Sequence, residues 1–182
     1  MNFKVKTHNA IADTGLTRLK DGNFSVSDSE KDPDAIILRS YKLPVEELND
    51  SLKAVARAGA GYNNVPVEEC SEKGVVVFNT PGGNANAVKE LVICGLLLSS
   101  RGIIQGHQFA QTLSNQDADE LTHLVETNKK NFKGNELKGK TIGIIGLGAI
   151  GSLLAQSVVS MDMKVIGYDP NISIDAAWQL PK

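Results

Sequence analysis

The 182-residue sequence lacks the features of several large classes of protein. It has only two cysteines, Cys70 and Cys94, without a CxxC spacing, which argues against a disulfide framework or a zinc site; we expect both to be buried core thiols and assign no metal ligand. Its longest apolar run, residues 91–98, is far shorter than the roughly 18–20 residues that cross a bilayer, and the first residues lack a signal-peptide pattern. We therefore expect a cytoplasmic protein without a membrane partner.

Charge of one sign is also scarce, since 19 basic and 21 acidic residues leave a formal net charge of −2. The chain contains no basic run, so it lacks the electrostatic footprint of a nucleic-acid or membrane-surface binder. Apolar residues make up 41% of the chain, which is enough to bury a core. The expected partners are a small molecule and further copies of the same chain, in a homodimer or another homo-oligomer.

The first part of the chain alternates short β-rich segments with helical ones. We expect strands at 3–7, 35–40, 54–58 and 75–79, and helices near 11–20, 44–51 and 66–73. The runs 34–38 and 74–78 are continuously apolar, which is typical of strands buried on both faces of a parallel sheet. This alternation predicts an open α/β sheet with crossover helices.

A long helix is expected over about 85–105, because apolar residues cover most of its circumference. Such a helix is normally buried between layers or domains, so we interpret it as the crossing between two domains. Residues 110–136 are polar, with one helical segment near 116–130, and they indicate a solvated connector.

A second α/β pattern begins at Leu137. It comprises a strand at 140–145, the glycine-rich turn 146–151 (GLGAIG), a helix over 152–161 and a strand at 164–168 that ends at Asp169. A GxGxxG match is weak alone, because a chain with 17 glycines contains one by chance in roughly one case in seven. Here it follows an apolar strand and opens a helix, and Asp169 lies close to the expected spacing of about 20 residues. The pattern predicts a dinucleotide site; the alternative is a tight turn without a ligand.

Each glycine of this turn has a physical task in the hypothesis. Gly146 permits the tight turn, Gly148 lets the pyrophosphate approach the backbone, and Gly151 lets helix and strand pack closely. The N–H groups of Ala149 and Ile150 have no acceptor within the helix and are expected to point at the anion.

The acidic residue at the strand end selects the cofactor. Asp169 can accept hydrogen bonds from ribose hydroxyls, and its charge would repel a 2′-phosphate. The sequence therefore favours NAD over NADP.

Four stretches together resemble the D-2-hydroxyacid dehydrogenase family, most closely its branch that oxidises 3-phosphoglycerate. They are 36–40 (IILRS), 55–64 (VARAGAGYNN), 77–84 (VFNTPGGN) with Glu90, and 136–148 (ELKGKTIGIIGLG). The resemblance implies a flavodoxin-like substrate-binding domain over 1–83, a crossing helix and connector over 84–136, and an incomplete NAD-binding Rossmann domain over 137–182.

The resemblance also implies a substrate site. The backbone N–H groups of Gly59, Ala60 and Gly61 would bind the substrate carboxylate, with Ala60 also near the nicotinamide end of the cofactor. Arg39 and Arg57 match basic positions that reach the substrate phosphate. The alternative for each arginine is a surface side chain on an edge loop.

The chemistry that the family implies is hydride transfer from C2 of a 2-hydroxy acid to NAD, in the phosphoglycerate branch as part of serine biosynthesis. A histidine paired with a carboxylate takes the hydroxyl proton, and an arginine holds the substrate carboxylate. In the family these three residues follow the last residue of this chain, so we assign no catalytic residue and expect His8, His107 and His123 to be surface residues. We expect the chain to be truncated, inactive alone, and self-associated through residues 85–105.

Three other functions remain open at this point. The protein could be a dehydrogenase of another 2-hydroxy acid, a non-catalytic NAD-sensing corepressor of the same fold, or an independent small α/β binding module. Residues 101–135, which are longer than in many relatives and lack the tryptophan often found there, have no assigned role.

Overall fold

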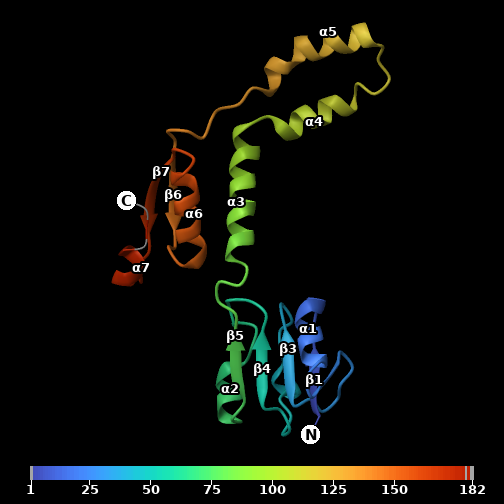
Figure 1. Ribbon diagram of the computed structural model, residues 1–182, viewed down its shortest axis with the longest axis vertical. Helices are drawn as coiled ribbons and strands as arrows, with labels where there is room; N and C mark the ends of the chain where they lie inside the picture. The colour runs from blue at the N-terminus through green and yellow to red at the C-terminus, as the bar shows by residue number, and fades with distance from the viewer. Residues whose placement is uncertain (1, 179, 181–182) are drawn as a thin grey trace. The chain divides into compact units, whose positions relative to one another are not determined.

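The computed structural model describes residues 2–178 and 180, and its contacts divide the chain into two compact units, residues 1–84 and 85–182 (Figure 1). The expected division into 1–83, 84–136 and 137–182 stays a prediction. Residues 1, 179 and 181–182 of these ranges lie outside the described residues.

The first unit is built on a five-stranded parallel sheet with the order β2-β1-β3-β4-β5. Its strands are β1 (Phe3–Thr7), β2 (Phe24–Ser27), β3 (Ala35–Leu38), β4 (Ala54–Arg57) and β5 (Val76–Asn79), and its helices are α1 (Asp13–Lys20), the 3-10 turn η1 (Val45–Glu47) and α2 (Val67–Glu72). This strand order is the flavodoxin-like one, so the predicted fold class is confirmed. The sequence reading missed β2, because its four residues FSVS are few and half polar.

A core cluster lies on the face of this sheet where Ile36 pairs in register with Val55, and Val55 with Val77. Its buried members are Ile36, Leu38, Leu43, Leu48, Leu52, Val55, Val65, Cys70 and Val75. The helix expected over 44–51 is wrong, since only the turn η1 forms there. Irregular backbone around η1 lets Leu43, Leu48 and Leu52 all reach the core, which one straight helix with this spacing would not do.

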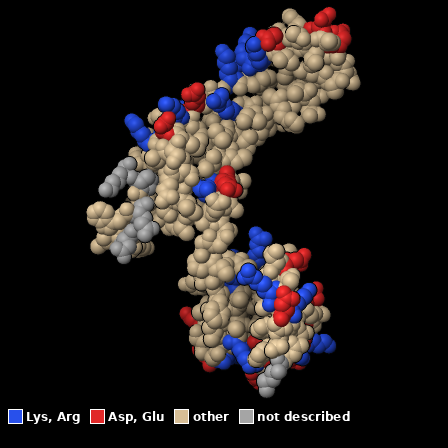
Figure 2. All heavy atoms as spheres, in the orientation of Figure 1, with Lys and Arg blue, Asp and Glu red and all other residues tan. Residues whose placement is uncertain are grey.

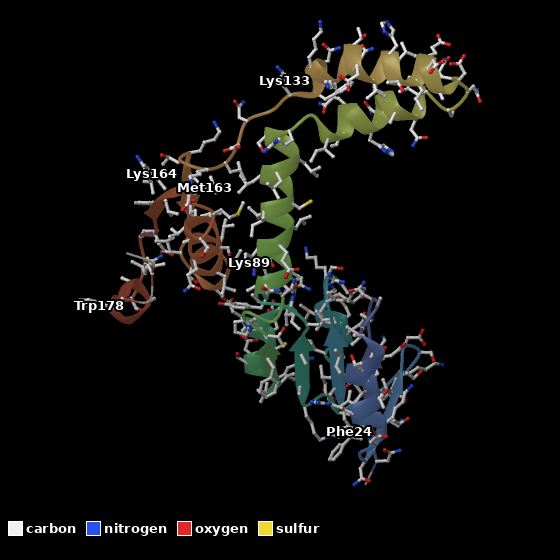
Figure 3. The ribbon with its side chains drawn as sticks, turned by 45° about the horizontal axis from the view of Figure 1, so that its top comes forward. Phe24, Lys89, Lys133, Met163, Lys164 and Trp178 are labelled. Carbon is white, nitrogen blue, oxygen red and sulfur yellow. The ribbon has the colours of Figure 1, made fainter. Side chains whose placement is uncertain are left out.

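The second unit contains a two-stranded parallel sheet and most of the helices. Its elements are α3 (Ala85–Ser100), α4 (Ile103–Gln111), α5 (Ala118–Asn128), the 3-10 turn η2 (Lys129–Phe132), β6 (Thr141–Ile145), α6 (Ala149–Val159), β7 (Lys164–Tyr168) and α7 (Ile174–Trp178). The core cluster between β6, β7 and α6 includes Leu154, Val158 and Met163, which is labelled in Figure 3. Side chains of α3 pack against this cluster through Val92, Ile93 and Leu96.

The long helix ends at Ser100, earlier than the expected residue 105, because the chain turns away and later returns to this point. The backbone N–H of Asn135 donates to the carbonyl of Ser100 at 2.8 Å. A Cβ at Gly102 would lie 2.8 Å from Cα of Phe132, so this close approach needs glycine. Residues 101–134 are thus an excursion made of α4, α5 and η2, with its first and last residues together.

Charge along α5 complements the helix dipole. Asp117 caps its start by accepting from the N–H of Glu120 at 2.9 Å. Figure 2 shows acidic side chains at this start, where Asp119 and Glu120 lie in the first turn, and basic ones where α5 passes into η2 at Lys129 and Lys130. Negative charge at the first turn and positive charge at the last stabilise a helix.

Helix α3 is less buried than its composition predicts. Leu91 is 71% exposed and Leu97 41% exposed. Cys70 is buried, and desolvation raises the pKa of its thiol, but Cys94 on α3 is exposed, which corrects the expectation for this cysteine.

In the part of the chain that the structure describes, no helix is long and apolar enough to cross a membrane, and no three acidic, histidine or cysteine side chains are grouped to hold a metal ion.

We expect the exposed apolar residues of α3 to drive self-association of the 182-residue chain. Leu91→Lys places a charge on the 71% exposed position and should lower the weight-average mass in sedimentation at micromolar concentration. Ser99→Lys adds the same charge at an exposed polar position of α3 and should leave the mass unchanged. A wild-type chain that sediments as a monomer would contradict the prediction.

Candidate functional site

The glycine-rich turn between β6 and α6 presents unpaired backbone donors. Gly146 has φ of +90°, which glycine adopts readily, and its N–H donates to the carbonyl of Tyr168 at 2.7 Å. Gly148 is the N-cap residue of α6 and supplies no capping side chain. Among the described residues, the N–H groups of Ala149 and Ile150 find no acceptor, so they are available to an anion.

Two glycines of this turn differ in what a side chain would meet. A Cβ at Gly151 would lie 2.0 Å from the carbonyl oxygen of Gly146 and 3.3 Å from Cγ2 of Ile144. A Cβ at Gly148 would meet nothing within 4 Å. Gly151 therefore lets α6 pack on the turn, whereas Gly148 borders open space at the start of the helix, where a diphosphate would lie.

Asp169 follows β7 and is tied to the turn. Its Oδ1 accepts from the N–H of Asn171 at 2.9 Å, and its Oδ2 accepts from the N–H of Leu147 at 2.8 Å. These two hydrogen bonds hold the pKa of the carboxyl below its ordinary value. Each carboxylate oxygen keeps a second lone pair, so it can still accept the predicted hydrogen bond from a ribose hydroxyl. The sequence reading did not foresee that the same side chain orders the turn.

The turn fits the diphosphate of a dinucleotide on three observations. Donors without acceptors stand at the start of α6, the space beside Gly148 is open, and a carboxylate lies at the end of the neighbouring strand. The assignment of Gly146, Gly148, Ala149, Ile150, Gly151 and Asp169 to cofactor binding stays a prediction, which the next substitutions test.

We expect Gly148→Ala to lower the affinity for NAD without unfolding the chain, because its methyl group would occupy the space next to the phosphate. Gly151→Ala is the matched variant, and it should destabilise the chain because its methyl group meets backbone. Calorimetric NAD titration and chemical denaturation of both variants separate the two effects. Unchanged NAD affinity in folded Gly148→Ala would contradict the assignment.

The carboxylate of Asp169 should make stability depend on pH. Because its folded pKa lies below the unfolded value, its contribution is complete above the unfolded pKa and is lost as the pH falls through the folded pKa. The free energies of unfolding of wild type and Asp169→Asn should therefore differ at neutral pH and converge towards about pH 2. Denaturation series at several pH values check this; curves that stay parallel would refute it.

The substrate residues predicted from the resemblance lie at the carboxyl edge of the first unit's sheet. Arg57 ends β4, and its Nε donates to the carbonyl of Arg39, which follows β3, at 3.0 Å. A Cβ at Gly59 would lie 1.7 Å from Nη1 of Arg57, so the guanidinium occupies the space that a side chain at position 59 would need. Arg57 is half-buried and bonded, while the Arg39 side chain is exposed at the same edge.

The loop 59–61 offers two backbone donors without an acceptor among the described residues. The N–H of Gly59 already donates to the carbonyl of Arg57 at 2.9 Å, and its contact with the substrate carboxylate stays a prediction. The two donors are the N–H groups of Ala60 and Gly61. Asn79, which sequence reasoning missed, holds the loop by donating from Nδ2 to the carbonyl of Ala60 at 2.7 Å.

The structure thus brings the predicted residues together in two separate groups. Arg39, Arg57, Gly59, Ala60 and Gly61 lie in the first unit, and the cofactor residues other than Ala60 lie in the second. The second role of Ala60, near the nicotinamide, stays a prediction. Among the histidines, His107 and His123 are exposed as expected, but the side chain of His8 is only 14% exposed, which corrects that expectation.

A flavodoxin-like parallel sheet followed by a strand, a glycine-rich turn, a helix and a second strand places the chain in the class of α/β proteins with a dinucleotide-binding motif. Residues 11–169 match the family model described as D-isomer specific 2-hydroxyacid dehydrogenase, catalytic domain. The chain belongs to this family.

Two curated relatives carry the same name. The chain is 37% identical over 174 residues to D-3-phosphoglycerate dehydrogenase of Rattus norvegicus and 36% identical over 167 residues to that of Methanocaldococcus jannaschii. These matches cover 92% and 90% of this chain but only 30% and 29% of the relatives, so the chain spans about three tenths of their length.

A solved structure is similar along almost the whole chain. The NAD+-bound 3-phosphoglycerate dehydrogenase of Entamoeba histolytica matches with a TM-score of 0.72 and 27% identity, over 97% of this chain and 57% of that one. A D-lactate dehydrogenase of Aquifex aeolicus, at 22% identity and a TM-score of 0.72, shows the shared fold.

Proposed function

We propose that this chain forms the substrate-binding and initial NAD-binding parts of a dehydrogenase that oxidises 3-phosphoglycerate to 3-phosphohydroxypyruvate. The proposal depends on one observation: Arg39 and Arg57 lie at the same sheet edge, where Nε of Arg57 donates to the backbone carbonyl of Arg39. Relatives named D-3-phosphoglycerate dehydrogenase, with 36–38% identity, support this choice of substrate.

The two arginines suit a phosphorylated acid. A guanidinium forms two parallel hydrogen bonds to phosphate and stays charged at every physiological pH. Because Arg57 already donates its Nε to a carbonyl, its terminal nitrogens are left to bind the phosphate. Together with exposed Arg39 it would place two positive charges opposite the phosphate of the substrate.

The opposite end of the substrate is a carboxylate, which the loop 59–61 would bind. The N–H groups of Ala60 and Gly61 are suited to an anion of this kind, because they have no acceptor among the described residues. Binding at both ends would fix the C2 carbon of the hydroxy acid between the phosphate and the carboxylate. When bound, NAD would supply the acceptor for the hydride.

The test is oxidation of 3-phosphoglycerate beside that of unphosphorylated glycerate by the product of the complete gene, with the 182-residue chain measured in parallel. Arg57→Gln should raise KM for 3-phosphoglycerate by roughly ten- to a hundredfold, because hydrogen bonds to charged groups contribute about 1.5–3 kcal/mol. KM for glycerate should change much less. Arg18→Gln, which removes an exposed arginine from α1, is the control for net charge.

Other outcomes would point elsewhere. Equal effects of Arg57→Gln on both acids would contradict the phosphate role and favour another 2-hydroxy acid, as in the hydroxypyruvate reductase of Thermotoga maritima, which is 37% identical over 140 residues. NAD binding without oxidation of any 2-hydroxy acid would instead favour an NAD-sensing protein of the same fold.

A further inference from the structure

The end of β1 holds the loop that bears Arg39. The side-chain Oδ1 of Asn9 accepts from the backbone N–H of Ser40 at 3.0 Å and from that of Tyr41 at 2.7 Å. Asn9 has φ of +67°, a conformation that asparagine tolerates better than most residues. The side chain of Asn9, 31 and 32 positions away in sequence, thus accepts hydrogen bonds from both N–H groups of the segment that follows Arg39.

A second set of contacts holds Tyr41 from the same strand end. The ring of His8 stacks on that of Tyr41, with 3.9 Å between centroids and an interplanar angle of 5°. Glu47 in η1 joins the set: its Oε2 lies 3.0 Å from Nε2 of His8 and accepts from Nζ of Lys6 at 3.0 Å, and its Oε1 accepts from the Tyr41 hydroxyl. The side chains of Lys6, His8 and Glu47 are partly buried, at 14–24% exposed, so the segment rests on a packed support.

The carbonyl groups of the same segment are bound from the other side. Asn64 donates from Nδ2 to the carbonyl of Tyr41 at 2.7 Å and to that of Arg39 at 3.2 Å. Arg57 donates to the carbonyl of Arg39 as well. Residues 39–41 therefore have their backbone held by three side chains, while the side chain of Arg39 is exposed and has no described contact with this network.

We propose that Asn9 is a positioning residue for substrate selectivity, which orients Arg39 towards the substrate phosphate through its two hydrogen bonds to Ser40 and Tyr41. The inference rests on the proposed function. A loop that is ordered before the substrate arrives loses less conformational entropy on binding, and a guanidinium must be well oriented to meet phosphate at two oxygens. Asn9 itself touches no substrate.

The test uses Asn9→Gly in the product of the complete gene, because glycine keeps the backbone conformation and removes the acceptor. We expect KM for 3-phosphoglycerate to rise about five- to tenfold, with kcat and KM for glycerate within about twofold of wild type. In an Arg39→Gln background the same substitution should have no further effect on KM, since Asn9 acts through Arg39. Asn23→Gly, at an exposed asparagine of the same unit, is the matched control.

Two further measurements keep the inference testable. Amide hydrogen exchange of Ser40 and Tyr41 should accelerate in Asn9→Gly, and Asn9→Asp, which retains an acceptor oxygen, should keep KM within about threefold of wild type. Should Asn9→Gly fail to fold, Asn9→Asp still tests the inference. If Ser40 and Tyr41 exchange as slowly in this variant as in wild type but the preference for 3-phosphoglycerate over glycerate is lost, the inference is overturned.

The outcomes separate the two proposals. If Arg39→Gln abolishes the preference for the phosphorylated acid while folded Asn9→Gly keeps it, the inference is wrong and the proposed function stands. If Asn9→Gly lowers kcat or raises KM equally for both acids, its role is merely structural and the inference is wrong. A wild type that treats both acids alike overturns the proposed function, and the inference with it.

Discussion

Parallel pairing of the strands is the constraint on which both candidate sites depend. In a parallel sheet all carboxyl ends meet at one edge, so residues distant in sequence become neighbours there. In the first unit this edge gathers Asn9 after β1, Arg39 after β3 and the loop 59–61 after β4. In the second unit the same rule places Asp169, after β7, beside the turn that follows β6.

Close approaches at glycine then shape these edges. The observed conformation of Arg57 uses space that a Cβ at Gly59 would fill, and α6 can pack on its turn only because Gly151 has no side chain. The two positions act differently. At Gly59 the space is occupied by the charged guanidinium of Arg57. At Gly151 it is occupied by the backbone carbonyl of Gly146, so this glycine supports the fold of the turn itself.

The elements that could be predicted from the sequence are those marked by a pattern of consecutive residues. The apolar runs of β3, β5 and β6 and the glycine-rich turn could be identified from residue order, because each is a continuous pattern of a few residues. The end of α3 could not, since it depends on a contact between Gly102 and Phe132 across the excursion. For the same reason the sequence showed the charged site residues but missed Asn9, Asn64 and Asn79. These asparagines act through hydrogen bonds to backbone 19 to 32 positions away, and no periodicity marks such a role.

Each unit uses a charged candidate binding residue to order its own loop. Asp169 accepts from the N–H of Leu147, and Arg57 donates to the carbonyl of Arg39, so charge and loop conformation are coupled in both. The coupling has a physical advantage, because a charged group that is already hydrogen-bonded is oriented before a ligand arrives and loses less freedom on binding. It also explains why an alanine at either position would mix two effects. Two kinds of substitution can distinguish ligand recognition from ordering of the loop. One keeps the shape of the side chain and removes its charge. The other keeps the charged residue and removes a neighbouring residue that holds the loop by hydrogen bonds.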